Sequence, residues 1–230
     1  MQAPRLVLAA FVALLVALLE VASAAPALAE LRTDRLSKGQ KKAWKSMAAM
    51  ALATDPQGRP LHPTLRGLWL DVDSSPHVIH VELRRQRGSG AIAGRFRIER
   101  IEPDGRFEAM LILDLRTIDR VLPGGKGTQR VPFGDLGRAE RRAQVLSHEL
   151  AHAAWAGSQP ERARQALEVQ TEIERLAKLA RTVGTAGAGF AAEVEATERL
   201  IRLMEEPALL AEAAVSAELK GRFAAAMSSR

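Results

Sequence analysis

The sequence predicts an α+β fold in which a group of strands precedes a group of helices. Between residues 61 and 115, short segments alternate apolar and polar side chains and are separated by turns rich in glycine and proline. This pattern is typical of antiparallel strands joined in hairpins. After residue 135 the chain becomes alanine-rich and shows helical periodicity to its end. Strands and helices that are segregated along the chain indicate an α+β arrangement rather than an alternating one.

The first residues predict an export signal. Met1–Arg5 carries one positive charge, Leu6–Leu19 is an unbroken apolar run, and Ala-x-Ala patterns end at Ala24 and at Ala29. The apolar run is shorter than the ~20 residues of a membrane-spanning helix. We therefore expect a signal peptide over residues 1–24 and an exported protein, periplasmic or secreted, with no stable membrane insertion after cleavage. The alternative is an uncleaved N-terminal segment that anchors the protein in the membrane.

The predicted elements follow in order. A helical segment over residues 25–60 contains a helix at 31–53, and a domain over 61–183 contains the strands and the first two helices. The predicted strands are Gly67–Val72, Val78–Leu83, Ala91–Ile101 and Phe107–Leu115. The predicted helices run from the N-cap Asp135 to Ala156 and from Glu161 to about Val183, the second opening with the capping-box spacing of Ser158 and Glu161. A small-residue break then leads to a C-terminal helical extension over 184–230, with helices at Ala191–Met204 and Pro207–Met227.

Composition excludes several kinds of site. The 230 residues include no cysteine, which rules out disulfides, cysteine-ligated metals and cysteine nucleophiles. The net charge is +6, but basic residues alternate with acids along helices, as in residues 138–142, which is typical of a solvated helix face. No nucleic-acid-binding motif is present, so we expect no nucleic-acid partner. The loop at residues 123–127 lacks the Ser or Thr that a phosphate-binding loop needs after its lysine.

One motif, His148-Glu149-Leu150-Ala151-His152, carries the chemistry of the chain. Residues four apart lie on one face of a helix, so His148 and His152 can bind a single metal ion. Glu149 lies about 100° round the helix from His148, where its carboxylate can reach a metal-bound water. Zinc accepts such nitrogen ligands and lowers the pKa of its water toward ~7. The motif predicts a Zn²⁺ site with Glu149 as catalytic base. The competing interpretation is a pair of hydrogen-bonded histidines on an ordinary helix.

The motif resembles that of the zincin metallopeptidases. The resemblance covers about residues 65–180, with the motif helix as its clear part and the strands as its weak part. It implies a zincin-like fold, zinc-dependent hydrolysis and a peptide or protein substrate. It also implies that an edge strand of the sheet aligns the substrate, and Phe107–Leu115 is our candidate for that strand.

The third metal ligand separates the zincin subfamilies. The metzincin pattern would place Gly and His where this chain has Trp155 and Ser158. The aspzincin Gly-Thr-x-Asp is also absent, since residues 184–187 read Gly-Thr-Ala-Gly, and peptide deformylases need a cysteine. The chain is therefore most similar to the gluzincins, whose third ligand is a Glu on the following helix, although their Asn-Glu-x-x-Ser-Asp signature is missing.

The helix over residues 161–183 offers three glutamates for this role. Glu172 lies closest to the apolar stripe of that helix on a 100° wheel, so it is the expected ligand, with Glu168 and Glu174 as alternatives. Metallopeptidases also need an oxyanion donor, and tyrosine is absent. No residue is assigned to that role; upstream candidates are His62, His77 and His80.

These observations lead to one prediction and one alternative. The prediction is an exported zinc-dependent peptidase of gluzincin type, which hydrolyses peptide bonds with water activated by Glu149. The alternative is a non-catalytic exported module that keeps a zincin-like fold for binding or assembly. An open groove beside the two motif histidines favours the enzyme, whereas a plugged site favours the module.

Overall fold

The computed structural model describes residues 30–85, 92–120, 136–183 and 188–228. The predicted signal peptide, the loop at 123–127 and the predicted N-cap Asp135 lie outside these residues. Within the described residues, no helix is both long and apolar enough to cross a bilayer.

Four strands form one mixed sheet in the order β1-β2-β4-β3. The strands are β1 (Glu30–Arg32), β2 (Val78–Arg84), β3 (Gly94–Ile101) and β4 (Phe107–Asp114). β1, β2 and β4 run parallel to one another, and only β3 is antiparallel to its neighbour β4. The α+β class is confirmed, but the predicted all-antiparallel arrangement is wrong for the pairing of β2 with β4.

The β3–β4 hairpin is the part of the sheet that local sequence predicts correctly. Its turn contains Gly105 with φ +88°, a left-handed conformation that favours glycine, and the Glu102 N–H donates to the Arg106 carbonyl at 2.7 Å. β4 lies between β2 and β3, so the predicted edge strand Phe107–Leu115 is in fact internal, and the antiparallel edge strand is β3. The sequence does not distinguish the two strands because alternation reports the faces of a strand, not its place in the sheet order.

The segment predicted as a strand at Gly67–Val72 is helical. It belongs to α3 (Pro63–Asp73), which begins with proline at a position where the missing N–H costs nothing. Its buried residues, Leu65, Trp69 and Val72, follow the helical rather than the two-residue period. The apolar density of Gly-Leu-Trp-Leu does not by itself distinguish the two periods.

The helix expected over residues 31–53 is α2 (Lys38–Ala51), capped by Ser37 and Gln40 in a capping box. Residues before it form β1 instead. The Trp44 ring of α2 lies 5.3 Å from the Trp69 ring of α3, so the two helices pack through aromatic side chains.

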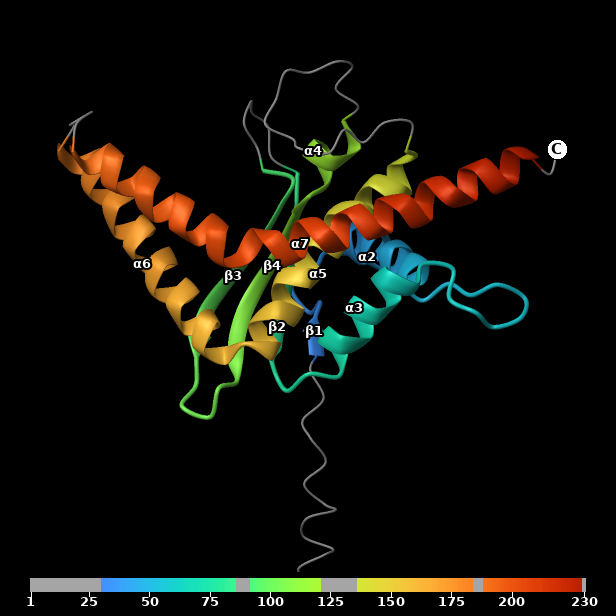
Figure 1. The fold of residues 1–230 in the computed structure, drawn as a ribbon, viewed down its shortest axis with the longest axis horizontal. Helices are drawn as coiled ribbons and strands as arrows, with labels where there is room; N and C mark the ends of the chain where they lie inside the picture. Colours follow the sequence, from blue (N-terminus) through green and yellow to red (C-terminus); the bar gives the residue numbers. More distant parts are fainter. Residues whose placement is uncertain (1–29, 86–91, 121–135, 184–187, 229–230) are drawn as a thin grey trace, which may run out of the picture.

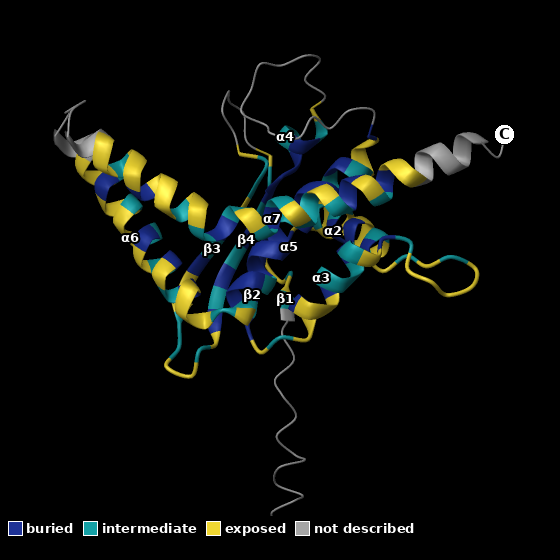
Figure 2. Cartoon of the chain, viewed as in Figure 1, coloured by how far each residue is buried: buried dark blue, intermediate teal, exposed yellow. Residues whose placement is uncertain are grey.

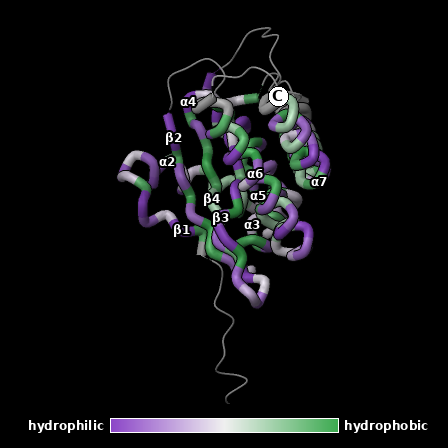
Figure 3. Tube along the Cα trace, turned by 90° about the vertical axis from the view of Figure 1, so that its left-hand side faces the viewer, coloured by the Kyte–Doolittle hydropathy of each residue, from purple (hydrophilic) through white to green (hydrophobic). Residues whose placement is uncertain are grey.

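The remaining helices are α4 (Leu115–Asp119), α5 (Arg138–Ser158), α6 (Pro160–Val183) and α7 (Ala188–Ser228). The last three of these form a second layer. Figure 1 shows α5 behind α7, with α6 and the first half of α7 forming an antiparallel pair on one side. In the turned view of Figure 3 the sheet lies on one side of the molecule, with α5, α6 and α7 on the other.

α7 is one helix where the sequence predicts two. It continues through Pro207 for 41 residues and bends where it crosses α5 (Figure 1). A proline inside a helix removes one hydrogen bond and clashes with the preceding turn, so it bends the helix without having to end it. Packing of α7 against both α5 and α6 keeps its two halves in place.

A main hydrophobic core joins these elements, and a smaller cluster of Val169, Leu176 and Ala196 lies between α6 and α7. The main core includes Leu36 and Trp44 from the N-terminal segment, the strands and α5, and Val215 and Leu219 from α7. Figure 2 shows the buried residues concentrated in the sheet and α5. The three regions that are distinct along the sequence therefore share a core.

Candidate metal centre

The motif lies in the middle of α5, a helix that is buried along most of its length. Thirteen of the sixteen residues from Arg141 to Ala156 are buried. Glu149 and His152 are among them, whereas the His148 side chain is 17% exposed. Of the uncharged residues that flank the motif, Val145, Leu146, Ser147 and Ala153 are buried as well.

The two histidines present their Nε2 atoms to each other at 3.1 Å. A carboxylate from α7 completes the group: Glu205 Oε2 lies 3.4 Å from His148 Nε2, and Glu205 Oε1 lies 3.7 Å from His152 Nε2. Among the described residues, these three form the one cluster of His, Asp and Glu side chains whose ligand atoms lie within 4.8 Å of one another.

The structure does not bring the expected third ligand to this cluster. Glu172 is exposed on α6, as are the alternatives Glu168 and Glu174. Glu174 instead pairs with Arg97 of β3 at 3.3 Å. The carboxylate beside the motif histidines belongs to Glu205, so Glu205 replaces Glu172 as the candidate third ligand.

A second glutamate of α7 holds the other side of His148. Glu212 Oε2 lies 3.0 Å from His148 Nδ1, and Glu212 Oε1 accepts from Gln144 Nε2 at 3.1 Å. Glu205 and Glu212 are seven residues apart and therefore on the same side of α7. The two carboxylates contact the imidazole at both nitrogens, which fixes the orientation of the ring.

The sequence contains a weak indication that Glu212 has a hydrogen-bonded, buried position. It is the only charged residue between Pro207 and Ser216, a stretch that otherwise consists of apolar residues and one serine. A lone acid in such a stretch must be hydrogen-bonded if it is buried. The helical wheel of α6 could not reveal Glu205 or Glu212 because the partner helix is not the one that follows the motif.

Charges in the cluster shift the pKa of each motif residue. Burial lowers the pKa of His148, but hydrogen bonds to Glu205 and Glu212 outweigh burial and raise it to about 10. Burial, followed by the positive charge of His148, lowers the pKa of His152 to about 4. Near neutral pH one imidazole of the metal-free pair is therefore charged and the other is neutral.

Glu149 lies against the edge strand. It is 3% exposed, and burial together with the negative charges of Glu205 and Glu212 raises its pKa to about 8 against the opposing charge of His148. A hydrogen bond from the Phe96 backbone acts on its carboxylate, while its Oε2 is buried and has no hydrogen-bond partner among the described residues. A methyl group added at Gly94 would come 2.3 Å from Glu149 Oε1, so glycine leaves the room that this carboxylate occupies.

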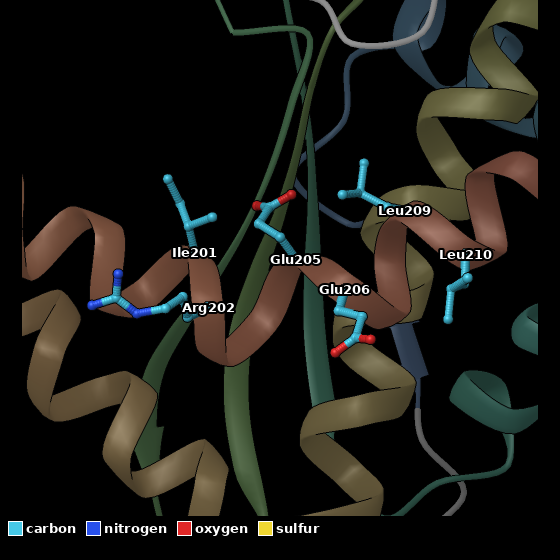
Figure 4. A pocket seen from close by; sticks show the side chains of 6 residues that line it. All are labelled: Ile201, Arg202, Glu205, Glu206, Leu209 and Leu210. Carbon is cyan, nitrogen blue, oxygen red and sulfur yellow. The ribbon is translucent and has the colours of Figure 1, made fainter.

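A groove of about 440 Å³ opens beside Glu205 on α7. Figure 4 shows Glu205 pointing to the same side of the helix as Ile201 and Leu209, with Arg202, Glu206 and Leu210 on the other side. The Glu205 side chain is 34% exposed. The residues that line this groove all belong to α7, and Glu205 is the one member of the cluster among them.

The donor set fits a zinc ion. Ligands at about 2.0–2.1 Å in a tetrahedron lie about 3.3 Å apart, close to the observed separations of 3.1, 3.4 and 3.7 Å. Two imidazoles and one carboxylate leave a fourth position open, as in catalytic zinc sites. The buried, unpartnered Glu149 Oε2 and the Glu212 carboxylate behind His148 are further features of such sites.

The other described histidines lie away from the cluster and have structural surroundings. The His77 ring stacks on Phe107 at 3.8 Å and accepts from its backbone N–H, and burial lowers its pKa. His80 Nε2 lies 2.8 Å from Glu108, and His62 precedes α3. None joins the metal cluster, so none gains support as an oxyanion donor.

No family model, curated protein or solved structure matches the chain.

Proposed function

We propose that the chain is an exported zinc-dependent peptidase in which His148, His152 and Glu205 hold the metal and Glu149 is the catalytic base. The observation that carries the proposal is the convergence of three ligand atoms within 4.8 Å, two from the motif and one from Glu205, which lies more than fifty residues further along the chain. A chance occurrence of the motif on an ordinary helix would not require a carboxylate from another element to meet it.

When bound, Zn²⁺ supplies Lewis acidity, which polarises a carbonyl group and makes a water molecule a better nucleophile at neutral pH. Proton transfer falls to the chain's own residues. Glu149 takes the proton of the attacking water and passes it to the leaving amine. Its buried position keeps the carboxylate out of bulk water, and a cation held by the three ligands would favour its ionised form against the raised pKa.

Glu212 has a positioning role in this proposal. Its hydrogen bond to His148 Nδ1 leaves Nε2 as the nitrogen that faces Glu205 and His152. Gln144, itself fully buried, fixes the other oxygen of Glu212. The ligand set is thus oriented before any metal arrives.

The non-catalytic module is a second candidate because of a specific observation. Glu149 is almost fully buried, and the chain has no tyrosine to stabilise an oxyanion. The groove on α7 does not decide between the two candidates, because Glu205 lines it and the two motif histidines do not.

The test uses three variants of the purified exported protein. We expect the wild type to bind one zinc per chain and to cleave a mixture of fluorogenic peptides. Glu149→Gln keeps the zinc and loses the cleavage, whereas Glu205→Gln loses the zinc. Glu172→Gln, which changes an exposed glutamate on α6, is the matched control and retains both.

The outcomes separate the candidates. Zinc binding without cleavage in the wild type would favour the module, and equal cleavage by wild type and Glu149→Gln would rule out the catalytic role of Glu149. Loss of zinc from Glu172→Gln but not from Glu205→Gln would mean that Glu172, as the helical wheel predicts, and not Glu205 is the third ligand. A circular-dichroism spectrum of each variant shows whether the fold is intact.

A further inference from the structure

Helix α2 carries a stripe of four lysines that the proposed peptidase site does not use. The stripe consists of Lys38, Lys41, Lys42 and Lys45, and all four are exposed. Their spacing of three, four and seven residues places them within an arc of about 100° on the helix, over about 10 Å of its length. They therefore form one face rather than a scatter of charges.

The opposite face of α2 fixes this stripe in place. Trp44, Met47 and Ala51 are buried and pack toward α3 and α5. On a helical wheel their mean direction is roughly opposite to that of the lysines. Since the inner face is anchored in the core, the lysines must point away from the molecule.

The charge of the stripe is not neutralised within the described part of the protein. α2 contains no acidic residue, and among the described residues none of the four lysines forms a salt bridge. Several other cations are paired, as Arg142 is with Asp119 and Arg84 is with Glu82. The stripe also differs in composition: it holds four of the seven lysines in a chain that has 26 arginines.

We propose that this lysine stripe binds the anionic surface of a phospholipid bilayer. Lysine is a compact, flexible point charge that suits diffuse attraction, whereas arginine suits the bidentate contacts used in nucleic-acid recognition. A cluster of four or more lysines on one helix face is drawn to anionic lipid headgroups, at about 1 kcal/mol for each lysine near the surface.

The contact is electrostatic and peripheral. The exposed face of α2 adds only Gly39, Ser46 and Ala49 to the lysines, so it offers no large apolar side chain for insertion between lipids. Binding of this kind weakens steeply with ionic strength. It is independent of the metal centre and does not rest on the proposed peptidase function.

The experiment measures sedimentation of the exported protein, purified as the producing cell processes it, with two kinds of vesicle. One contains phosphatidylcholine alone, and the other also contains phosphatidylglycerol at roughly a third of the lipid, which gives its surface a negative potential. The variant replaces Lys38, Lys41, Lys42 and Lys45 by Gln. The matched control makes the same change of charge at exposed cations elsewhere, namely Arg162→Gln, Arg175→Gln, Arg199→Gln and Lys220→Gln.

Each lysine near an anionic surface strengthens binding about fivefold. We expect the wild type and the control variant to bind the anionic vesicles more tightly than the neutral ones, with the difference lost at high salt. The stripe variant is expected to lose that difference, with an apparent affinity lower by on the order of several hundredfold. An unchanged circular-dichroism spectrum in all three proteins serves as the folding control.

Three results would overturn the proposal. One is the absence of any preference of the wild type for anionic over neutral vesicles. Another is an equal preference in the stripe variant and the control variant, which would mean that net charge alone is responsible. The third is lysine-dependent binding to DNA without binding to anionic vesicles, which would reassign the stripe to a nucleic-acid partner.

Discussion

At position 94 the absence of a side chain is what allows Glu149 to lie against strand β3. The Cβ of any other residue would come 2.3 Å from Glu149 Oε1 and 2.9 Å from its Cδ. The carboxylate is buried and cannot move out of the way without loss of its hydrogen bond from the Phe96 backbone. Glycine is therefore required here for room rather than for an unusual backbone conformation.

We predict that Gly94→Ala lowers peptidase activity by on the order of a hundredfold, because a displacement of about 1 Å at a reacting group costs that much. Zinc content should be unchanged, since His148, His152 and Glu205 are not moved directly. Activity and elemental analysis measure the two effects. Gly67→Ala is the control, because nothing lies within 4 Å of a Cβ at Gly67 and alanine suits the helix that contains it.

Glu212 illustrates a residue that acts through another. We predict that Glu212→Gln lowers zinc affinity by about 10- to 100-fold, the usual effect of removing a carboxylate behind a histidine ligand. Competition with a chromogenic chelator measures the change. Glu206→Gln, at an exposed glutamate on the same helix, should leave the affinity within about twofold, since exposed charges interact weakly. An equal loss of zinc affinity in both variants would mean that the total negative charge of α7, and not the contact of Glu212 with His148, determines the affinity.

At the scale of elements, α7 is a structural part of the protein rather than an appended arm. Its buried residues, among them Met204, Val215 and Leu219, join the core, and the same helix supplies Glu205 and Glu212. Packing of this helix and formation of the site therefore depend on the same contacts.

A pair of substitutions on α7 tests this dependence. Leu219 is 3% exposed, so Leu219→Ala should lower the free energy of unfolding by about 2–5 kcal/mol, whereas Leu210→Ala, at a residue 67% exposed, should change it by less than about 0.5 kcal/mol. Urea denaturation of the metal-free proteins measures both. Similar small effects for the two leucines would mean that α7 is only loosely attached.

At the scale of the whole molecule, the candidate metal centre joins helices α5 and α7, and its charge state predicts that metal binding depends on pH. In the metal-free protein the pKa of His148 is raised to about 10 and that of His152 is lowered to about 4. At pH 7, then, His148 carries a proton that the metal must displace, while His152 is already neutral.

We predict that zinc affinity rises with pH, by up to about tenfold per pH unit between about pH 6 and pH 8, as one proton leaves for each zinc bound. Chelator competition across this range, and proton release measured in weakly buffered solution, check the slope. An affinity that is flat or falls over this range would contradict the assignment of His148 as a protonated ligand.

Removal of zinc should also lower the thermal unfolding midpoint, because the metal binds the folded chain.

Local sequence was sufficient for features that depend on neighbouring residues. The motif helix with His148, Glu149 and His152 on it and the β3–β4 hairpin around Gly105 follow from spacing and turn chemistry. The predicted capping of the next helix by Ser158 is wrong, because Ser158 ends α5 and its hydroxyl donates to the Trp155 carbonyl. The α+β class follows from the order of these elements.

Tertiary structure alone decided the features that depend on distant residues. The parallel pairing of β2 with β4, the helical state of Gly67–Val72 and the continuity of α7 through Pro207 depend on packing that no local pattern reports. The same holds for the carboxylate at the metal cluster. Glu172 lies closer to the motif along the sequence, but only the path of α7 across α5 brings Glu205 to the histidines, because a ligand is selected by position in space and not by distance along the chain.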